Sequence, residues 1–520
     1  MLVSLKVGST VDGVKRAPIM ILGCTSDAGK SFLAMGLCRA LSNRGIRVAP
    51  FKAQNMSNNA AVTADGLEIG RAQYAQALAA RVEPDDRMNP ILIKPLSDVR
   101  GALIMNGRPA PEIEAVPWME RSQFTWPVVE SSLQSLIDEF DVVVIEGAGS
   151  PAEVNLRASD IVNMRVALAV GAHSYLCSDI DRGGSFAHLL GTWHCLAAEE
   201  QALLKGFVLN KFRGDPLLLG DALSWLEAKT GVPTVAVVPW IHHQLPEEDR
   251  LIVRNADRTA TSEFPESSES SESFGSSVRV GIVLYPYASN TDEFDALGSV
   301  DGVSVATIRS GGSLDGFDAV ILPGSRNVAE SIQWLRSVGL GSELARMAQR
   351  GGSVFGICGG MQMLGDWIKD PHNLEGGDVE GFGLLQITTE FAIEKVTRPF
   401  LAVLLPTNSE VAGYEIHHGR TAPTNDSEAA PLFGNETPDA GWQQGSVIGV
   451  YAHALLEDTK FRSWWLSTLS KRSNGSFESS VPANWAVQLD VEFDRVALHL
   501  EQTGFVDFVL SVGAQPSHEA

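Results

Sequence analysis

The chain contains little cysteine. There are five cysteines in 520 residues, an odd number, and they are widely spaced. Such a set excludes the disulfide frameworks of small secreted proteins and matches no zinc-ligand pattern. We therefore expect a reducing, cytoplasmic environment, in which a reactive cysteine would stay a free thiol.

Long hydrophobic runs are also missing. No stretch approaches the roughly 18 uninterrupted apolar residues that a membrane-spanning helix requires. The N-terminus shows no basic segment followed by an apolar segment and a small-residue cleavage site, so we expect no export. These absences favour a soluble protein.

Positive charge is scarce. Lys and Arg number 40 against 63 Asp and Glu, which gives a net charge of −23, and no Lys/Arg-rich run exists. A chain this acidic is repelled by nucleic acids and by anionic membranes, so we expect neither as a partner. An anionic small molecule could still bind where basic side chains gather in one cleft.

What the chain does contain predicts several α/β domains. Its length favours two to four domains, and 44% hydrophobic residues with 49 glycines are typical of soluble α/β proteins. Residues 258–278 are rich in serine and acidic residues and have almost no apolar side chains, which predicts a flexible linker. We expect an N-terminal extension (1–16), a first domain (17–255), a linker (256–277), a second domain (278–510) and a tail (511–520).

Both halves alternate short β-branched runs with amphipathic helical patterns. This alternation predicts two doubly wound domains with mostly parallel sheets, in which ligands bind at the carboxyl ends of the strands. The expected strands of the first half are 18–23, 47–51, 141–146, 173–177, 206–210 and 234–238. Those of the second half are 278–284, 303–308, 319–323, 353–357 and 446–452.

The most conspicuous segment is 354–364, where an apolar strand ends at Cys358 and a helical pattern begins at once. Glycines flank Cys358, as the crowded backbone of a nucleophile elbow requires. The start of a helix also favours the thiolate form of cysteine. The segment therefore predicts covalent acyl chemistry at Cys358, rather than a cysteine that only fills the core.

A phosphate-binding loop is predicted at 23–31, between a strand and the expected helix 31–41. Backbone N–H groups at a helix N-terminus bind anions, Lys30 would reach the β- and γ-phosphates, and the Ser31 hydroxyl would bind Mg²⁺. Cys24 stands where the strict pattern has glycine. The spacing instead resembles the dethiobiotin-synthetase-like branch of P-loop proteins. The expected ATP-binding residues are Gly23, Thr25, Asp27, Gly29, Lys30 and Ser31.

A second strand, 141–146, ends in Glu146 and then glycines, where the Mg²⁺ partner of a phosphate loop is expected. Asp65 or Glu68 could add another metal contact, and either could equally be a solvated carboxylate. We take Ser31, Asp65 and Glu146 as the candidate metal site.

Seven further segments carry a resemblance to the cobyric acid synthase family. They are 50–59, 68–73, 88–95, 155–157, 160–164, 179–187 and 205–215. The resemblance implies ATP- and glutamine-dependent amidation of the b, d, e and g carboxylates of adenosylcobyrinic acid a,c-diamide in cobalamin synthesis. The corrinoid substrate is a polycarboxylate, which basic side chains at strand ends could bind. The expected substrate-binding residues are Lys52, Gln54, Asn55, Arg71, Lys94, Arg157 and Arg182.

The second half resembles a class I glutamine amidotransferase domain, which implies a flavodoxin-like fold beside the P-loop NTPase-like first half. Cys358 would attack the glutamine amide, and His453, at the end of strand 446–452, is the expected general base. The backbone N–H groups of Gly324 and Gly359 would hold the oxyanion. Gln362 and His417 are expected at the glutamine pocket, and His417 ranks below His453 as the base.

One departure from the family pattern concerns the partner of the histidine. Class I glutaminases commonly read His-x-Glu, whereas this chain reads His453-Ala454-Leu455. A backbone carbonyl or another carboxylate could orient His453, and Glu457 is not assigned to that role.

Two other functions compete with this interpretation. The nearest is the sister enzyme that amidates the a and c carboxylates of cobyrinic acid and shares both modules. The other is a non-catalytic switch ATPase of the partition-protein type with a degenerate glutaminase, which the intact Cys358 and His453 disfavour. The oligomeric state is not predicted.

Overall fold

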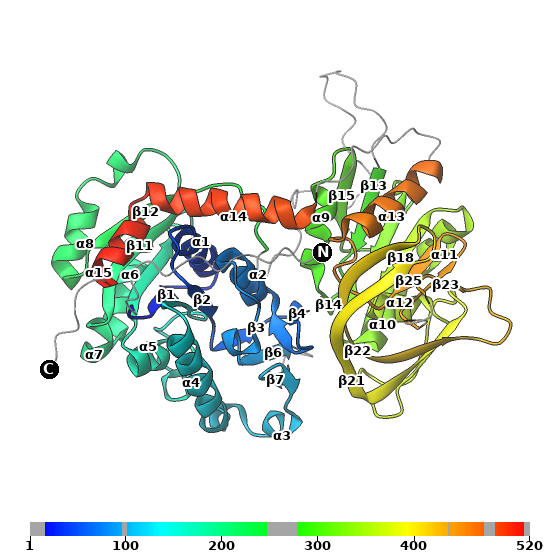
Figure 1. Ribbon diagram of the computed structural model, residues 1–520, viewed down its shortest axis with the longest axis horizontal. Coiled ribbons are helices and arrows are strands. Elements are labelled where there is room, and N and C mark those ends of the chain that lie inside the picture. Colours follow the sequence, from blue (N-terminus) through cyan, green and yellow to red (C-terminus); the bar gives the residue numbers. More distant parts are fainter. Residues whose placement is uncertain are drawn as a thin grey trace, which may run out of the picture.

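The computed structural model describes residues 16–95, 101–246, 278–434, 437, 439–472 and 484–513. The expected linker 256–277, all of the expected extension except Arg16, and most of the tail therefore lie outside the described residues. Two α/β halves lie side by side, and one long helix crosses the top of the view between them (Figure 1). Within the described part of the chain, no helix has the length and apolar character that crossing a membrane demands.

The first half, residues 16–246, is called the P-loop half after its expected phosphate loop. It is built on a six-stranded parallel sheet. Its order is β12 (Thr234–Pro239), β11 (Leu204–Phe212), β10 (His173–Asp179), β1 (Ile19–Gly23), β9 (Val142–Glu146) and β2 (Val48–Phe51). All six strands were predicted from the sequence. Alternate side chains of β1 pack on opposite faces of the sheet. Ile19 and Ile21 belong to one apolar cluster, and Met20 and Leu22 belong to another. Both faces of the sheet are thus covered, which confirms the doubly wound prediction.

The helices of this half are α1 (Lys30–Asn43), α2 (Arg71–Ala80), α3 (Pro111–Glu114), α4 (Ser122–Glu139), α5 (Met164–Val170), α6 (Ser185–Cys195), α7 (Ala198–Gln201) and α8 (Ala222–Thr230). Two small sheets extend it toward the second half. One contains β3 (Gln54–Met56), β6 (Ile91–Pro95), β7 (Gly101–Met105) and β8 (Arg108–Pro109), and the other pairs β4 (Ala60–Val62) with β5 (Glu68–Gly70).

The second half, residues 278–472, is called the glutaminase half after its expected activity. It contains a seven-stranded sheet that is parallel except at one edge. Its order is β15 (Val303–Ile308), β13 (Val278–Val283), β16 (Ala319–Leu322), β18 (Ser353–Ile357), β25 (Val447–Val450), β24 (Gly441–Gln444) and β23 (Ala430–Pro431). The five parallel strands were predicted. The surrounding helices are α9 (Asp295–Gly298), α10 (Val328–Ser337), α11 (Leu340–Gln349), α12 (Gly359–Leu364) and α13 (Thr459–Arg472).

A long antiparallel hairpin was not predicted. Strands β21 (Ile387–Leu404) and β22 (Ser409–Pro423) pair along most of their length, and β19 (Trp367–Lys369) and β20 (Val379–Glu380) join them in one sheet. The hairpin lies on the side of the glutaminase half that faces the P-loop half (Figure 1). A further short pair, β14 (Ala288–Ser289) with β17 (Gly324–Ser325), lies beside the main sheet.

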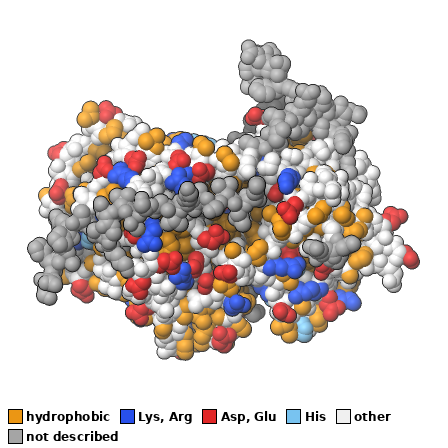
Figure 2. Space-filling view, viewed as in Figure 1, with side chains coloured by type: hydrophobic (Ala, Val, Ile, Leu, Met, Phe, Trp, Pro, Cys, Tyr) orange, Lys and Arg blue, Asp and Glu red, His pale blue; other side chains and the backbone are white. Residues whose placement is uncertain are grey.

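The C-terminal helices correct the expected domain boundary. We predicted that the second domain extends to 510, but α14 (Trp485–Gln502) and α15 (Phe505–Gly513) pack on the P-loop half. Leu500 lies directly against Gly36 of α1, and Phe505 packs edge-on against Tyr175 of β10. The chain therefore returns to its first half after completing the second. On the face in Figure 2, acidic and basic side chains are spread over both halves.

Candidate active sites

The predicted phosphate loop runs from the end of β1 to the start of α1. Gly29 has φ 94°, and a Cβ at this position would collide with the Asn210 side chain, so only glycine fits. Lys30 is buried, and its Nζ donates to the carbonyls of Thr25 (3.2 Å) and Gly149 (3.0 Å). The loop therefore wraps around the ammonium group of Lys30. This places a positive charge inside the loop where phosphates are expected to bind.

Glu146, at the end of β9, lies directly against this loop. Its Oε1 accepts from Ser31 Oγ at 2.7 Å and pairs with Lys52 Nζ at 3.1 Å, and its Oε2 accepts from Gln76. Burial opposes ionisation, but Lys52 and these hydrogen bonds outweigh it, so the pKa of Glu146 lies below its usual value. Ser31 and an ionised Glu146 are oxygen ligands suited to Mg²⁺ beside bound phosphates.

The structure does not bring Asp65 to this pair. Asp65 is exposed at the turn between β4 and β5, beside Gly66, which faces Thr397 of the long hairpin. Glu68 is buried, and it contacts Lys94 and pairs with Lys395 of the glutaminase half at 2.8 Å. Of the proposed metal ligands, only Ser31 and Glu146 are adjacent.

A cavity of about 1050 Å³ opens over the loop. Its lining includes four predicted ATP-binding residues, three predicted substrate-binding residues and the predicted metal ligand Glu146. The first four are Asp27, Gly29, Lys30 and Ser31, and the three are Lys52, Asn55 and Arg182. Arg182 Nη2 donates to Asp27 Oδ2 at 3.0 Å. Asn210, Trp240 and His243 also line the cavity. We did not predict these three, although Asn210 stands at the end of an expected strand, as ligand-binding residues of parallel sheets do.

A second cavity of about 280 Å³ adjoins the first and shares Met56, Ala148 and Gly149 with it. Predicted Gln54 and Arg157 line it, together with the half-exposed Trp118 and Leu156. Arg157 Nη1 donates to the Cys195 carbonyl at 3.1 Å, and the same side chain contacts Glu200. Besides apolar side chains, this cavity is lined by the basic Arg121 and Arg157 and by the carboxylates of Glu153, Asp160 and Glu200.

Two predicted substrate residues lie elsewhere. Arg71 and Lys94 are buried where the two halves meet, and each is paired with carboxylates, so neither lines the two cavities. Their basic character suggested an anionic ligand, but the partners are carboxylates of the protein itself. For Arg71, only a contact with a residue 221 positions later reveals this, whereas Lys94 pairs with Glu68 of its own half.

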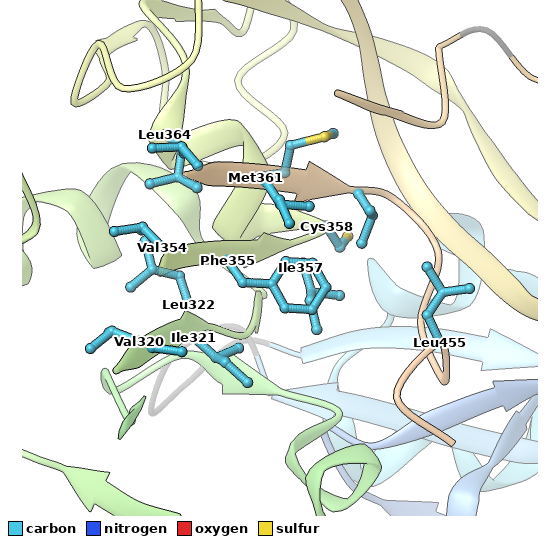
Figure 3. Packing of buried hydrophobic residues seen from close by; sticks show 14 of the residues in the cluster. Val320, Ile321, Leu322, Val354, Phe355, Ile357, Cys358, Met361, Leu364 and Leu455 are labelled. Atoms are coloured by element: carbon cyan, nitrogen blue, oxygen red, sulfur yellow. The ribbon is translucent and has the colours of Figure 1, made fainter. Parts of the chain in front are cut away.

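In the glutaminase half, Cys358 stands at the end of β18 among buried apolar side chains (Figure 3). Its backbone has φ 52° and ψ −109°, and α12 begins at the next residue. A non-glycine residue with positive φ at a strand-to-helix turn is the strained geometry of a nucleophile elbow. The Sγ lies 3.7 Å from the Ile416 carbonyl of β22.

His453 follows β25 and interacts with the Cys358 side chain. Its Nδ1 lies 2.9 Å from Glu293 Oε1, and the other oxygen of Glu293 accepts from the Ala454 N–H at 2.7 Å. Burial by itself lowers the pKa of His453, but Glu293 and Cys358 outweigh it and raise that pKa to about 10. The ring is thus protonated at neutral pH beside the sulfur.

Glu293 is the carboxylate that we could not assign from the sequence. It lies in a short 3₁₀ turn, Thr291–Phe294, and is 1% exposed. One feature of the sequence could have pointed to Glu293. The polar run 290–293 follows the strand 278–284 and therefore lies at the carboxyl edge of the predicted sheet, where functional residues are expected. No local pattern links it to His453, 160 residues later.

The two glycines predicted to form the oxyanion hole, Gly324 and Gly359, stand in segments that lie close together, and Gly324 also lies close to His453. A Cβ on Gly359 would lie 2.7 Å from the Ser325 nitrogen, and one on Gly324 would lie 2.9 Å from His453 Cε1. The segment Gly324–Ser325 is therefore packed directly against the elbow, where an oxyanion hole is needed.

Gln362 and His417 meet at Tyr451. Gln362 Nε2 donates to the Tyr451 hydroxyl at 3.3 Å, and His417 stacks on the Tyr451 ring with centroids 3.6 Å apart. Burial lowers the pKa of His417, so this ring is neutral. Of the two rings, His453 is the one that interacts with the Cys358 side chain, and its role as the base stays a prediction.

Comparison with known proteins covers both halves. Residues 19–252 match the family model described as the CobQ/CobB/MinD/ParA nucleotide binding domain, and residues 279–461 match the CobB/CobQ-like glutamine amidotransferase domain. The cobyric acid synthase of Deinococcus radiodurans is 51% identical over 86% of this chain and 92% of its own length. This chain belongs to the cobyric acid synthase family.

Other members of that family match still more of the chain. The cobyric acid synthase of a Polaromonas species is 46% identical over 95% of this chain and 97% of its own length. Among solved structures, a glutamine amidotransferase covers 37% of the chain with a TM-score of 0.30 and 19% identity. The family membership confirms the resemblance of both halves that the sequence segments indicated.

Proposed function

We propose that the chain catalyses ATP- and glutamine-dependent amidation of the b, d, e and g carboxylates of adenosylcobyrinic acid a,c-diamide, giving adenosylcobyric acid. The observation that carries this proposal is the pairing of a phosphate-loop site with a Cys358–His453–Glu293 site in a chain whose relatives are cobyric acid synthases. A carboxylate is a poor electrophile toward ammonia, so its amidation needs both an activating site and an ammonia source.

At the first site, ATP would bind over the loop, with its phosphates against Lys30 and the N-terminus of α1. A bound Mg²⁺, held by Ser31 and Glu146, would supply positive charge to the transferring phosphoryl group. The substrate carboxylate attacks the γ-phosphorus, the bond to the β-phosphate oxygen breaks, and ADP and an acyl phosphate form. The protein contributes orientation and the charge of Lys30.

We propose that the corrinoid binds at the smaller cavity, with one edge of the macrocycle inside it and the rest outside. This cavity adjoins the loop at Gly149, so a bound macrocycle would present a side-chain carboxylate to the γ-phosphate. Trp118 and Leu156 offer apolar surface to the ring, and Arg157 offers charge to its carboxylates.

At the second site, the Cys358 sulfur, whose proton passes to His453, attacks the glutamine side-chain carbonyl. The negative oxygen of the tetrahedral intermediate would be held by the Gly359 N–H and the segment Gly324–Ser325. Protonated His453 gives its proton to the departing ammonia and then activates the water that releases glutamate. Glu293 holds the ring in the orientation that this transfer needs. Ammonia then attacks the acyl phosphate, and phosphate leaves.

Replacement of the nucleophile tests the division of labour. Cys358→Ala should lower glutamine-dependent amidation by at least about 10³-fold, because no thioester can form. Amidation with added ammonium salt should persist, since the first site is intact. Loss of both activities would contradict the proposed roles of the two halves.

Product analysis tests the substrate. Incubation of the wild-type protein with adenosylcobyrinic acid a,c-diamide, MgATP and glutamine, followed by mass spectrometry, should show the addition of four amides. Two amides added to cobyrinic acid would identify the sister activity instead. Failure of glutamine to yield glutamate with either corrinoid would favour the switch ATPase.

A further inference from the structure

The turn that carries Glu293 is held by the other half of the molecule. Asn290, which opens the turn, has φ 55°, and it exchanges two hydrogen bonds with the segment that begins at Asn59. The Asn290 N–H donates to Asn59 Oδ1 at 2.8 Å, and the Ala60 N–H donates to Asn290 Oδ1 at 3.0 Å. These reciprocal bonds fix the entry to the turn, and all four groups are buried.

Arg71, the first residue of α2, holds the turn from a second direction. Its Nε donates to Asp292 Oδ2 at 2.6 Å, and its Nη2 contacts Glu457. Asp292 directly precedes Glu293 in the chain, and the Glu457 N–H bonds to the carbonyl of Ala454, whose own N–H bonds to Glu293. Arg71 therefore joins the two segments on which Glu293 and His453 stand.

The charges around Arg71 explain why its position matters. Asp292, Glu293 and Glu457 are three carboxylates brought together in the interface, and burial raises the pKa of Glu457 to about 7 even with Arg71 beside it. Without the guanidinium, Asp292 and Glu457 would repel each other and would lose a buried hydrogen-bond partner. This repulsion would displace the turn Thr291–Phe294, and with it Glu293, from His453.

The opposite side of His453 is also tied to the P-loop half. The Tyr414 ring stacks on the His453 ring with centroids 5.5 Å apart and an angle of 23°. Its hydroxyl donates to the Ala60 carbonyl at 2.9 Å and lies 3.4 Å from Asn290 Nδ2. The same short segment, 59–71, thus contacts both the residue stacked on the histidine and the turn that orients it.

We propose that Arg71 and Asn59 are positioning residues of the glutaminase site, supplied by the P-loop half. They hold Glu293 against His453, so the glutaminase has its working geometry only when the two halves are docked. The inference rests on the proposed glutaminase role of Cys358 and His453. It gives Arg71 a role different from the substrate binding expected from the sequence.

The test compares Arg71→Met with Arg44→Met in the full-length protein. Arg44 also pairs with two carboxylates, Glu501 and Asp507, but it lies far from the turn, against the C-terminal helices. In Arg71→Met, kcat for glutamate release should fall at least about 10-fold. The KM for glutamine should change little, because the guanidinium of Arg71 bonds Asp292 and Glu457 and not the expected glutamine-binding residues Gln362 and His417. Ammonium-driven amidation should stay within about twofold of wild type, and Arg44→Met should match wild type in both assays.

The pH profile separates positioning from a general loss of stability. Glu293 raises the pKa of His453, so a displaced Glu293 lowers it, and the alkaline limb of the glutaminase profile should move to lower pH in Arg71→Met. An Asp292→Asn, Arg71→Met double variant should lose no more activity than Arg71→Met, because both act through one contact. An unshifted limb, or fully additive losses, would overturn the proposal.

A second variant covers the case in which Arg71→Met does not fold. Asn59→Ala removes the acceptor of the Asn290 N–H and should give the same pattern in a milder form. Unchanged glutamate release in both variants, with Cys358→Ala inactive, would refute the positioning role and leave the proposed function standing. Glutamate release that survives in Cys358→Ala would instead refute the proposed function.

Discussion

At the scale of single residues, the glutaminase site depends on one strained backbone and one buried ion pair. Cys358 keeps φ 52° although it is not glycine, a conformation that costs on the order of 1–3 kcal/mol. Its neighbour His453 would be neutral from burial alone, and it is protonated because Glu293 lies 2.9 Å from Nδ1. The thiol, the ring and the carboxylate therefore act as one unit.

Removing the charge of Glu293 should expose that dependence. Glu293→Gln keeps the size of the side chain but cannot stabilise the imidazolium, so the pKa of His453 should fall from its raised value of about 10. We expect kcat for glutamine hydrolysis to drop by about 10²–10⁴-fold, as for other triads that lose their carboxylate. Steady-state glutamate release across pH measures this.

The matched control for Glu293→Gln is Glu330→Gln. Glu330 lies in the first turn of α10 and accepts no bond from the catalytic residues. Its substitution should leave kcat unchanged. If the two variants behaved alike, Glu293 would have no special role.

At the scale of elements, α12 packs unusually closely on the end of β16. A Cβ on Gly360 would lie 2.0 Å from the Leu322 carbonyl oxygen and 2.7 Å from that of Pro323. Glycine at this position lets the helix approach the segment Gly324–Ser325, and this approach is what places the two candidate oxyanion groups together. We inferred from the glycines around Cys358 that the backbone there is crowded, and the short distances at Gly359 and Gly360 agree with that inference.

Gly360→Ala should be destabilising by about 2 kcal/mol or more, because the added methyl group meets backbone and not a flexible side chain. Chemical denaturation monitored by intrinsic fluorescence measures the loss. Gly191→Ala is the control, since Gly191 lies inside α6 with no heavy atom within 4 Å of an added Cβ. That variant should gain up to about 1 kcal/mol from helix propensity. Equal effects of both substitutions would contradict the packing argument.

At the scale of the whole molecule, the chain closes on itself. Helix α14 crosses from the glutaminase half and lies along α1 of the P-loop half (Figure 1). Arg39 of α1 is fully buried under it and bonds Asp494 at 2.8 Å and Asp490 through a second nitrogen. The phosphate-loop helix is thus braced by the last described part of the chain, and the two halves are linked at both ends of the glutaminase domain.

This brace should weaken in acid. Hydrogen bonds from Arg39 lower the pKa of Asp494 to about 2, below its usual 3.8, so its contribution is present above about pH 5 and is lost as the pH falls toward 2. Because Asp494 is half-exposed, we expect only about 1 kcal/mol from it. The free energies of unfolding of wild type and Asp494→Asn should therefore differ at pH 6 and converge near pH 2. A difference independent of pH would rule out this ion pair as the cause.

Much of the architecture could be predicted because it is written in local patterns. Every strand of the P-loop sheet and all five parallel strands of the glutaminase sheet appear as short apolar runs, since strands buried on both faces must be apolar throughout. The phosphate loop and the elbow were visible for a related reason. Each places its key residue next to glycines at a strand end, within ten residues of sequence.

The errors concern residues whose role depends on partners that no local sequence pattern marks. Arg71 and Lys94 were expected at the corrinoid because a basic side chain in a polar segment carries no mark of its partner. The hairpin β21–β22 was missed because its alternation is irregular and one face is largely exposed. The C-terminal helices were assigned to the wrong half because an amphipathic pattern specifies that a face is buried, without specifying against which core.

The sequence by itself determined the two modules, the order of their strands along the chain, the phosphate loop and the strand-to-helix turn that carries the candidate nucleophile Cys358. Each is a local feature, set by backbone sterics and hydrophobic periodicity over a few residues. Only the tertiary structure decided the carboxylate partner of His453, the contacts of Arg71 and the docking of α14 on α1. The first two are contacts between buried charges far apart in the chain, which form because a charge removed from water must find an opposite charge. The docking of α14 combines apolar packing of Leu500 with the pairing of the buried Arg39 to half-exposed carboxylates. Folding alone determines which partners are within reach.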